Sequence, residues 1–145
     1  MVVKIIENKE EKIEMVDLIN ELKKSKKVDY AGAIYTFEGI VRGKEENMNL
    51  KKLILSTPDT KKTTEEIKKI VESTKIKYGV YDISVIHHIG EFYTGDSLFL
   101  VAVLGNHRNE TLDALTDVVE RVKFDVDFKK EEISDNGTKT ILAGG

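Results

Sequence analysis

Apolar residues recur along the chain with the spacing of three amphipathic helices. Residues 10–24 place apolar side chains at every third or fourth position, which is the period of one buried helical face. A second helix is predicted to begin at Thr63-Thr64-Glu65-Glu66, which has the order of a capping box, and a third at about Asn106. The apolar positions of these helices are Ile13, Val16, Ile19, Leu22, Ile67, Ile70, Val71, Leu112, Leu115, Val118, Val119 and Val122.

Between these helices, β-branched and aromatic residues gather in short runs that predict strands. The predicted strands cover residues 2–6, 31–42, 50–55, 80–89, 97–104, 126–133 and 138–142. Gly90 and Gly95-Asp96 lie between the fourth and fifth strands and predict a hairpin, while Asp135-Asn136-Gly137 predicts a turn of the Asn-Gly type between the last two. Residues 43–49 are polar and charged and predict a mobile loop. Because no linker or repeat divides the chain, residues 1–145 predict a single α+β domain.

The composition excludes several classes of protein. The chain has 145 residues, of which 40% are hydrophobic and 34% charged, as in a globular protein with a solvated surface. It has no apolar run that could span a bilayer and its N-terminus lacks the order of a signal peptide, so we expect a cytoplasmic protein without membrane contact. Lysines dispersed among glutamates and a net charge of −3 argue against nucleic-acid binding. Without cysteine, the chain has no thiolate nucleophile or thiolate metal ligand.

Arginine is scarce among the 23 basic residues, and its three positions are therefore informative. A planar guanidinium binds phosphate or carboxylate through two hydrogen bonds, which lysine cannot do. Arg108 follows Asn106 and His107 where a strand passes into a helix, a place where free main-chain amides favour an anion. We expect Asn106 to cap this helix; the alternative is that the two cationic residues only solvate the helix end. Arg42 ends a strand and is unspecific by itself, and Arg121 is expected on the surface.

Lysine and histidine pairs late in the chain are constrained by strand geometry. Lys129 and Lys130 are neighbours in a predicted strand, so their side chains project to opposite faces and only one can share a site with Lys123. His87 and His88 are separated in the same way and cannot easily chelate one ion. With no cysteine and no third histidine nearby, no metal site is predicted.

Read in order, these motifs resemble those of the large, catalytic subunit of molybdopterin synthase, the MoaE family. The similarity runs from about Asp29 to Ile133. Four segments carry it: the strand Phe37-Glu38-Gly39-Ile40-Val41-Arg42, the hairpin that begins at Ile86-His87-His88-Ile89-Gly90-Glu91, the pair His107-Arg108, and Lys123 with Phe128-Lys129-Lys130-Glu131. Phe128 stands where the family has Trp, and the segment from Lys123 to Lys129 is one residue shorter than in the family.

The resemblance implies an α+β fold with a mixed or antiparallel sheet, about three helices in an α/β hammerhead-like arrangement, and a small β subdomain. It implies a sulfurtransferase of molybdenum cofactor biosynthesis. Such an enzyme passes sulfur from the Gly-Gly thiocarboxylate of a small ubiquitin-like carrier to cyclic pyranopterin monophosphate, forming the dithiolene of molybdopterin. The implied assembly is a homodimer within a heterotetramer, and no cofactor is needed because the carrier supplies the sulfur.

The resemblance also implies roles for individual residues. Lys123 and Lys129 would be catalytic, with Lys123 beside the C-terminus of the carrier and Lys129 stabilising an oxyanion or moving a proton. A lysine with this role is expected to have a pKa lowered by burial or by neighbouring cations. The implied substrate-binding residues are Phe37, Ile40, Val41, Arg42, His107, Arg108, Lys130 and Glu131.

A second interpretation is a diverged, non-catalytic homologue that binds a pterin, a nucleotide or a ubiquitin-like partner. Residues 53–59 favour it, because they lack the Tyr-Glu segment of the family, whereas the retained lysines, His107 and Arg108 favour the enzyme. The residues Ala143-Gly144-Gly145 are similar to the tail of a sulfur carrier, but the rest of the chain does not resemble a ubiquitin-like domain.

Overall fold

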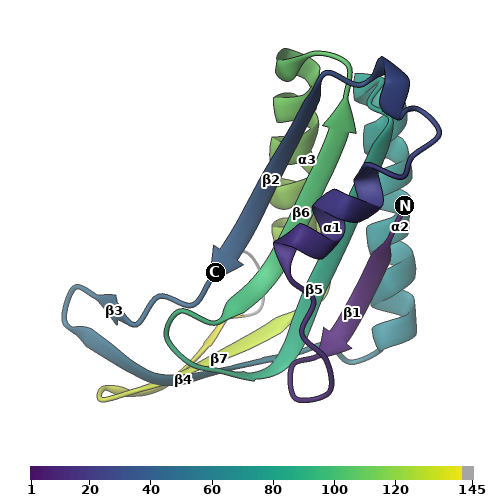
Figure 1. Ribbon diagram of the computed structural model, residues 1–145. Coiled ribbons are helices and arrows are strands. Elements are labelled where there is room, and N and C mark those ends of the chain that lie inside the picture. The colour runs from purple at the N-terminus through teal and green to yellow at the C-terminus, as the bar shows by residue number, and fades with distance from the viewer. Residues whose placement is uncertain (142–145) are drawn as a thin grey trace.

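Three α-helices and eight strands make up the described part of the chain, residues 1–141 of a computed structural model (Figure 1). The helices are α1 (Met15–Leu22), α2 (Thr60–Tyr78) and α3 (Arg108–Asp125), and a short 3-10 helix, η1, covers Val28–Tyr30. The strands are β1 (Val3–Glu7), β2 (Ala33–Ile40), β3 (Lys44–Glu45), β4 (Met48–Ser56), β5 (Asp82–Phe92), β6 (Ser97–Gly105), β7 (Lys129–Ser134) and β8 (Gly137–Ile141).

The strands are joined by hydrogen bonds in the order β2-β6-β5-β4-β7-β8, with β1 parallel to β5 and β3 beside β4. β5 links two parts of this sheet, because its residues up to His87 pair with β6 and its residues from Gly90 to Phe92 pair with β4. Gly90 has a φ of 116°, a conformation that favours glycine, and it lies where β5 passes from one part to the other. We call β1, β2, β5 and β6 the main sheet, and β3, β4, β7 and β8 the small sheet.

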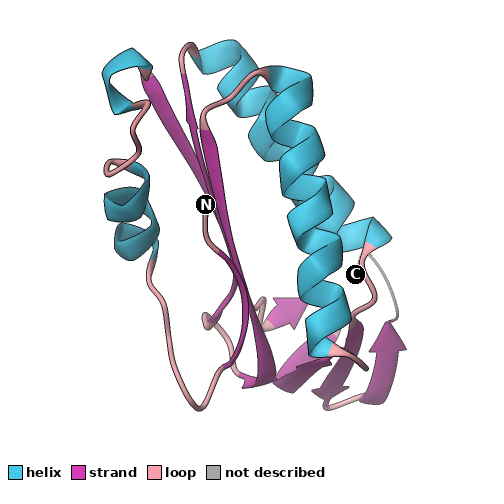
Figure 2. Cartoon of the chain, turned by 90° about the vertical axis from the view of Figure 1, so that its right-hand side faces the viewer, coloured by secondary structure: helices cyan, strands magenta, loops and turns pink. Residues whose placement is uncertain are grey.

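Helices cover both faces of the main sheet (Figure 2). The long helices α2 and α3 lie together on one face, where Ile67 and Val118 pack with Val85 of β5. On the other face, Leu18 and Leu22 of α1 pack with the next residue of β5, Ile86. Burial on both faces explains why β6 is continuously apolar from Leu98 to Leu104 and why β5 is buried at consecutive positions from Ile83 to Ile89.

The small sheet lies at one end of the main sheet and projects to one side of it (Figure 1). This arrangement confirms the predicted α+β fold with a small β subdomain. The predicted mobile loop at residues 43–49 is wrong, because Lys44 and Glu45 pair with Asn49 and Met48 as a short hairpin. Its exposed, charged side chains give no alternating pattern from which the pairing could be recognised.

The predicted starts of two helices are also wrong by a few residues. Asp59 caps α2 by accepting a hydrogen bond from the Lys62 amide at 3.1 Å, and Thr63 lies buried inside the helix. His107, not Asn106, is the N-cap of α3, because the Glu110 carboxylate accepts a hydrogen bond from the His107 amide. In a capping box, a Glu side chain three residues after the N-cap accepts a hydrogen bond from the N-cap amide. The predicted cap at Asn106 did not consider Glu110 in this role.

The remaining predicted elements agree with the structure to within a few residues, except that α1 is shorter at its start and β7 begins at Lys129 rather than Val126. The predicted last strand reaches Leu142, which lies outside the described residues, as does the Ala143-Gly144-Gly145 tail.

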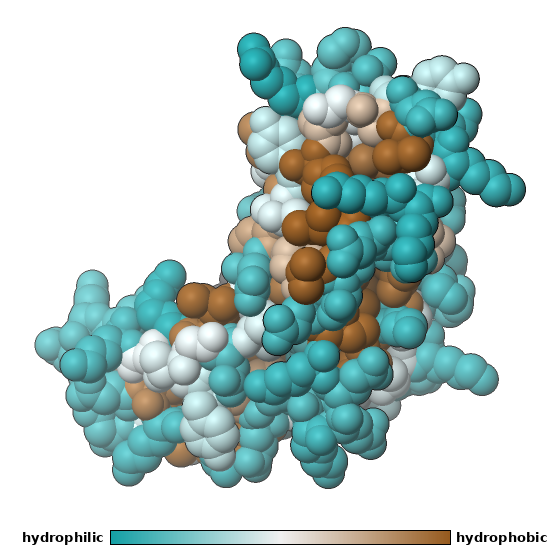
Figure 3. All heavy atoms as spheres, viewed as in Figure 1, coloured by the Kyte–Doolittle hydropathy of each residue, from teal (hydrophilic) through white to brown (hydrophobic). Residues whose placement is uncertain are grey.

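Polar side chains cover most of the face drawn in Figure 3, and apolar side chains gather beside α1 on the main sheet. Within residues 1–141, no helix combines the length and apolar character that crossing a membrane requires.

Candidate active site

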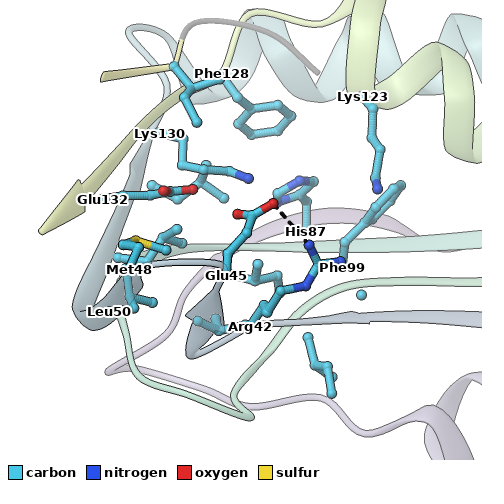
Figure 4. Close-up of a pocket in the computed structure, with 17 residues that line it drawn as sticks. Arg42, Glu45, Met48, Leu50, His87, Phe99, Lys123, Phe128, Lys130 and Glu132 are labelled. Carbon is cyan, nitrogen blue, oxygen red and sulfur yellow. Dashed lines mark hydrogen bonds and ion pairs between the residues drawn. The ribbon is translucent and has the colours of Figure 1, made fainter. Parts of the chain in front are cut away.

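A cavity of about 410 Å³ lies where the main sheet meets the small sheet (Figure 4). We call it the junction cavity. Its walls come from the ends of β2 and α3 and from β3, β4, β5, β6, β7 and β8. The lining residues are Gly39, Ile40, Val41, Arg42, Glu45, Met48, Leu50, Leu53, Leu55, His87, Leu98, Phe99, Lys123, Phe128, Lys130, Glu132 and Ile141.

Three cationic side chains reach into the junction cavity from three different elements (Figure 4). Arg42 follows β2, and its Nη1 lies 3.3 Å from Oε1 of Glu45. Lys123 comes from the last turn of α3, with its Nζ 5.5 Å from the centre of the Phe37 ring. Lys130 enters from β7. Several cations in a partly apolar cavity favour an anionic ligand.

Lys130 has the perturbed pKa that a proton-transferring lysine needs. Burial is the largest cause and lowers the pKa of Lys130, and the nearby charges of Lys123 and Arg42 lower it further. Glu132 and Glu45 act in the opposite direction and raise it. The net lowering means that Lys130 gives up its proton more readily than a lysine in water.

Lys129, the second residue predicted to be catalytic, lies outside the junction cavity. Its side chain is 49% exposed, and its Nζ lies 3.2 Å from Oε1 of Glu131. Because side chains alternate along β7, Lys130 and Glu132 face the cavity while Lys129 and Glu131 face away from it. Which of the two lysines faces the cavity depends on the residue at which β7 begins, since a shift of one residue moves each following side chain to the opposite face.

The other predicted site residues of the first motif lie at or behind the wall of the junction cavity. Ile40, Val41 and Arg42 line the junction cavity. Phe37 lies behind its wall, with its ring centre 5.8 Å from that of Phe99 in an edge-to-face contact and with Lys123 over its face.

His107 and Arg108 are not brought to the junction cavity in a single copy of the chain. They line a separate hollow with Gly32, Asn106, Asn109 and Glu110. Arg108 and Lys123 are fifteen positions apart on the helix, which corresponds to roughly 22 Å at about 1.5 Å per residue. Packing fixes this corner tightly, because a Cβ at Gly105 would collide with Oγ1 of Thr111. The predicted anion site and the predicted lysine site are therefore at opposite ends of α3.

Reasoning from the sequence missed several residues of the cavity and one contact outside it. Glu45 and Met48 were missed because their segment was taken for a loop, and His87 because it was considered only as a metal ligand. Within residues 1–141, no group of three or more possible metal-ligating side chains is found. Arg121 was expected on the surface, but its Nη1 donates a hydrogen bond of 2.8 Å to Oγ of Ser73 and so joins α3 to α2.

Comparison with known proteins decides the family. The family model described as MoaE protein matches residues 8–125. The chain belongs to the MoaE family. The molybdopterin synthase catalytic subunit of Thermoplasma volcanium is 29% identical over 133 residues, which cover 91% of this chain and 93% of that protein. That of Pyrococcus abyssi is 31% identical over 106 residues, 73% of this chain and 71% of that protein.

Solved structures of MoaE relatives have the same fold. Molybdopterin synthase from Staphylococcus aureus superposes with a TM-score of 0.83 at 24% identity, over 96% of both chains. A complex of subunits 1 and 2 of molybdopterin-converting factor from Helicobacter pylori superposes with a TM-score of 0.72 at 25% identity, over 99% of this chain and 90% of that one. The predicted family, and the prediction of an enzyme subunit of the molybdopterin synthase type, are confirmed by these similarities.

Proposed function

We propose that this MoaE chain transfers sulfur from the thiocarboxylate of a small ubiquitin-like carrier to cyclic pyranopterin monophosphate in the junction cavity. The observation that carries the proposal is the convergence of Arg42, Lys123 and Lys130 on one cavity of a chain without cysteine. A phosphate-bearing substrate matches the cations, and a sulfur donor is required from outside because the chain has no thiol.

The lysines suit the two halves of such a transfer. The thiocarboxylate sulfur forms a bond to a substrate carbon while the bond between that carbon and its oxygen breaks, and the oxygen leaves on the opened phosphate or as water. A water molecule then cleaves the bond between the sulfur and the acyl carbon, leaving a carboxylate on the carrier and a thiolate on the substrate. Two such transfers give the dithiolene. The ammonium group of Lys123 stabilises the oxyanion that forms on the acyl carbon. Lys130, with its lowered pKa, takes the proton of the attacking water. In this proposal Lys130 has the role that the resemblance implied for Lys129, because Lys130 is the lysine that faces the cavity.

A second copy of the chain completes the site in this proposal. His107 and Arg108 are suited to bind the substrate phosphate, yet they lie about 22 Å along α3 from Lys123 within one copy. A homodimer that places this end of α3 beside the junction cavity of the other copy would join the two groups. The carrier then docks from a different side, with its Gly-Gly tail entering the cavity toward Lys123.

Exposed apolar side chains near Lys123 support a protein partner. Ile40, which lines the cavity, is 57% exposed, and Phe124, which follows Lys123, is 56% exposed. Large apolar side chains of this kind are common in contacts between proteins. The relative from Helicobacter pylori was solved as a complex of two different subunits.

Reconstitution tests the proposal. The purified chain is mixed with a thiocarboxylated carrier and cyclic pyranopterin monophosphate, and the dithiolene product is followed by mass spectrometry. We expect product with the natural chain and at least a hundredfold slower formation with Lys123→Ala. If the natural chain binds the substrate but forms no product, under conditions where another MoaE protein does, the chain is a binding homologue and the proposal is wrong.

A further inference from the structure

His87 of β5 is held rigidly at the wall of the junction cavity. Its imidazole ring stacks between two phenylalanine rings, with centre-to-centre distances of 4.9 Å to Phe99 and 4.1 Å to Phe128. The planes are nearly parallel, at 22° and 21° respectively. Because both faces of the ring are covered, only its edges are available for polar contacts.

One hydrogen bond fixes which ring nitrogen carries the proton. Nδ1 of His87 lies 3.0 Å from the main-chain oxygen of His88. A carbonyl oxygen can only accept a hydrogen bond, so Nδ1 must be the protonated nitrogen of the neutral ring. Nε2 then carries a lone pair and can accept a hydrogen bond.

Burial and the nearby charges keep the His87 ring neutral. Burial is the main cause that lowers its pKa to about 4, and the charges of His88, Lys130 and Lys123 lower it as well. The hydrogen bond to His88 acts in the opposite direction. Among the described residues that line the junction cavity, His87 has the one neutral side chain with a nitrogen or oxygen atom, since the other polar side chains are charged.

We propose that His87 presents Nε2 to the junction cavity as a neutral acceptor for a ring N–H group of the bound substrate. The site would then recognise two parts of one molecule. The cationic side chains of the junction cavity bind the phosphate, and His87, stacked between Phe99 and Phe128, binds the heterocycle. This inference rests on the proposed function, because it requires a ligand that carries both an anionic group and an N–H donor. A neutral acceptor selects a ligand with such a donor and, unlike a carboxylate, does not repel the anionic phosphate.

Nitrogen-15 NMR of the natural chain tests the proposal directly. The chain has three histidines, so a sample labelled only in histidine rings gives few signals. We expect His87 to be the Nδ1-protonated tautomer at pH 7. Saturating cyclic pyranopterin monophosphate should shift the Nε2 signal of His87 in the direction of an accepted hydrogen bond, whereas inorganic phosphate should leave it unchanged. The ring signals of His88, on the other face of β5, are the internal control.

Two outcomes would overturn the inference while leaving the proposed function intact. One is an Nε2-protonated His87 in the free protein, and the other is an unmoved Nε2 signal although calorimetry shows the substrate bound. If calorimetry shows no binding of the substrate at all, both the inference and the proposed function fail.

Substitutions provide a second measurement. His87→Asn keeps a donor near the position of Nδ1 but removes Nε2, whereas His87→Gln keeps a polar atom near Nε2. If His87 binds the substrate and the transition state equally strongly, losing Nε2 weakens binding without slowing the chemical step. We therefore expect about a tenfold higher KM and an unchanged kcat for His87→Asn. We expect His87→Gln to recover much of this loss and His88→Asn, the matched control, to leave KM unchanged. Equal KM values for the Asn and Gln variants of His87, each shown to be folded, would contradict the assignment of Nε2.

Discussion

Neighbouring residues of the same type have different surroundings in this protein. Lys130 faces the junction cavity while Lys129 makes an ion pair outside it. His87 contributes to the cavity wall, whereas His88 lies on the other face of β5, near Glu11 and Lys12. Alternation along a strand therefore determines which member of each pair faces the junction cavity.

His88 is expected to make the stability of the protein depend on pH. Both ring nitrogens of His88 are buried without a hydrogen-bond partner among the described residues. Its pKa is lowered by burial first and by Lys12 second, while Glu11 raises it. Because the unfolded chain then binds the proton more tightly, the contribution of His88 to stability is lost as the pH falls below about 6.5.

Replacing His88 by leucine should stabilise the protein, and more so in acid. We expect His88→Leu to raise the free energy of unfolding by about 1 kcal/mol at pH 8, because two unpaired buried nitrogens are removed. The gain should be larger at pH 5. Urea denaturation of both proteins at both pH values measures the difference in the free energy of unfolding. Both proteins contain His87, so its own titration cancels in that difference. A gain that is the same at pH 5 and pH 8 would show that folding does not lower the pKa of His88.

At the scale of elements, α3 holds two functional groups apart. Its first turn presents His107 and Arg108, and its last turn presents Lys123. The helix is positioned by buried apolar residues against β6 and by the contact between Arg121 and α2. The distance between the two groups is therefore set by the rigid helix rather than by a loop.

The contact of Arg121 with α2 should be structural and not catalytic. Its Nη1 bonds Oγ of Ser73 at 2.8 Å and lies 3.5 Å from Oγ1 of Thr74. We expect Arg121→Met to lower the free energy of unfolding by about 1 kcal/mol, because the hydrogen bonds are lost while the apolar stem is retained. Turnover at 25 °C should not change. Urea denaturation and the reconstituted assay check the two parts, and a variant with natural stability but impaired turnover would contradict this role.

At the scale of the whole molecule, the sequence predicted the α+β fold and most of its elements, because runs of β-branched and apolar residues mark the strands at Val80–Ile89 and Ser97–Leu104 and the helical period marks the helices. The ordered motifs identified the family and the cationic residues of the site. The sequence could not predict that Lys130 replaces Lys129 at the cavity, because this depends on where β7 begins after α3. The distance of His107 and Arg108 from Lys123, in contrast, already follows from the predicted helix, because fifteen positions at about 1.5 Å each separate its two ends.

The proposed homodimer can be tested by mixing defective copies. Chains with Lys123→Ala and chains with Arg108→Ala are expected to be inactive alone but to regain up to about half of the natural activity together. The mixed dimer contains one site with Lys123 from one copy and Arg108 from the other. Differently tagged chains allow the mixed dimer to be isolated and assayed. If it is no more active than either parent, each site is built within one copy or not at all.

The central claim is that the lysine facing the junction cavity performs the chemistry, and one comparison tests it most directly. Lys130→Ala and Lys129→Ala are made separately, shown to be folded, and assayed for dithiolene formation under single-turnover conditions. The two substitutions remove the same side chain from adjacent positions of β7, so each is the control for the other. We expect Lys130→Ala to be slower by at least about a hundredfold and Lys129→Ala to stay within about twofold of the natural chain. A large loss with Lys129→Ala and a small one with Lys130→Ala would contradict the account.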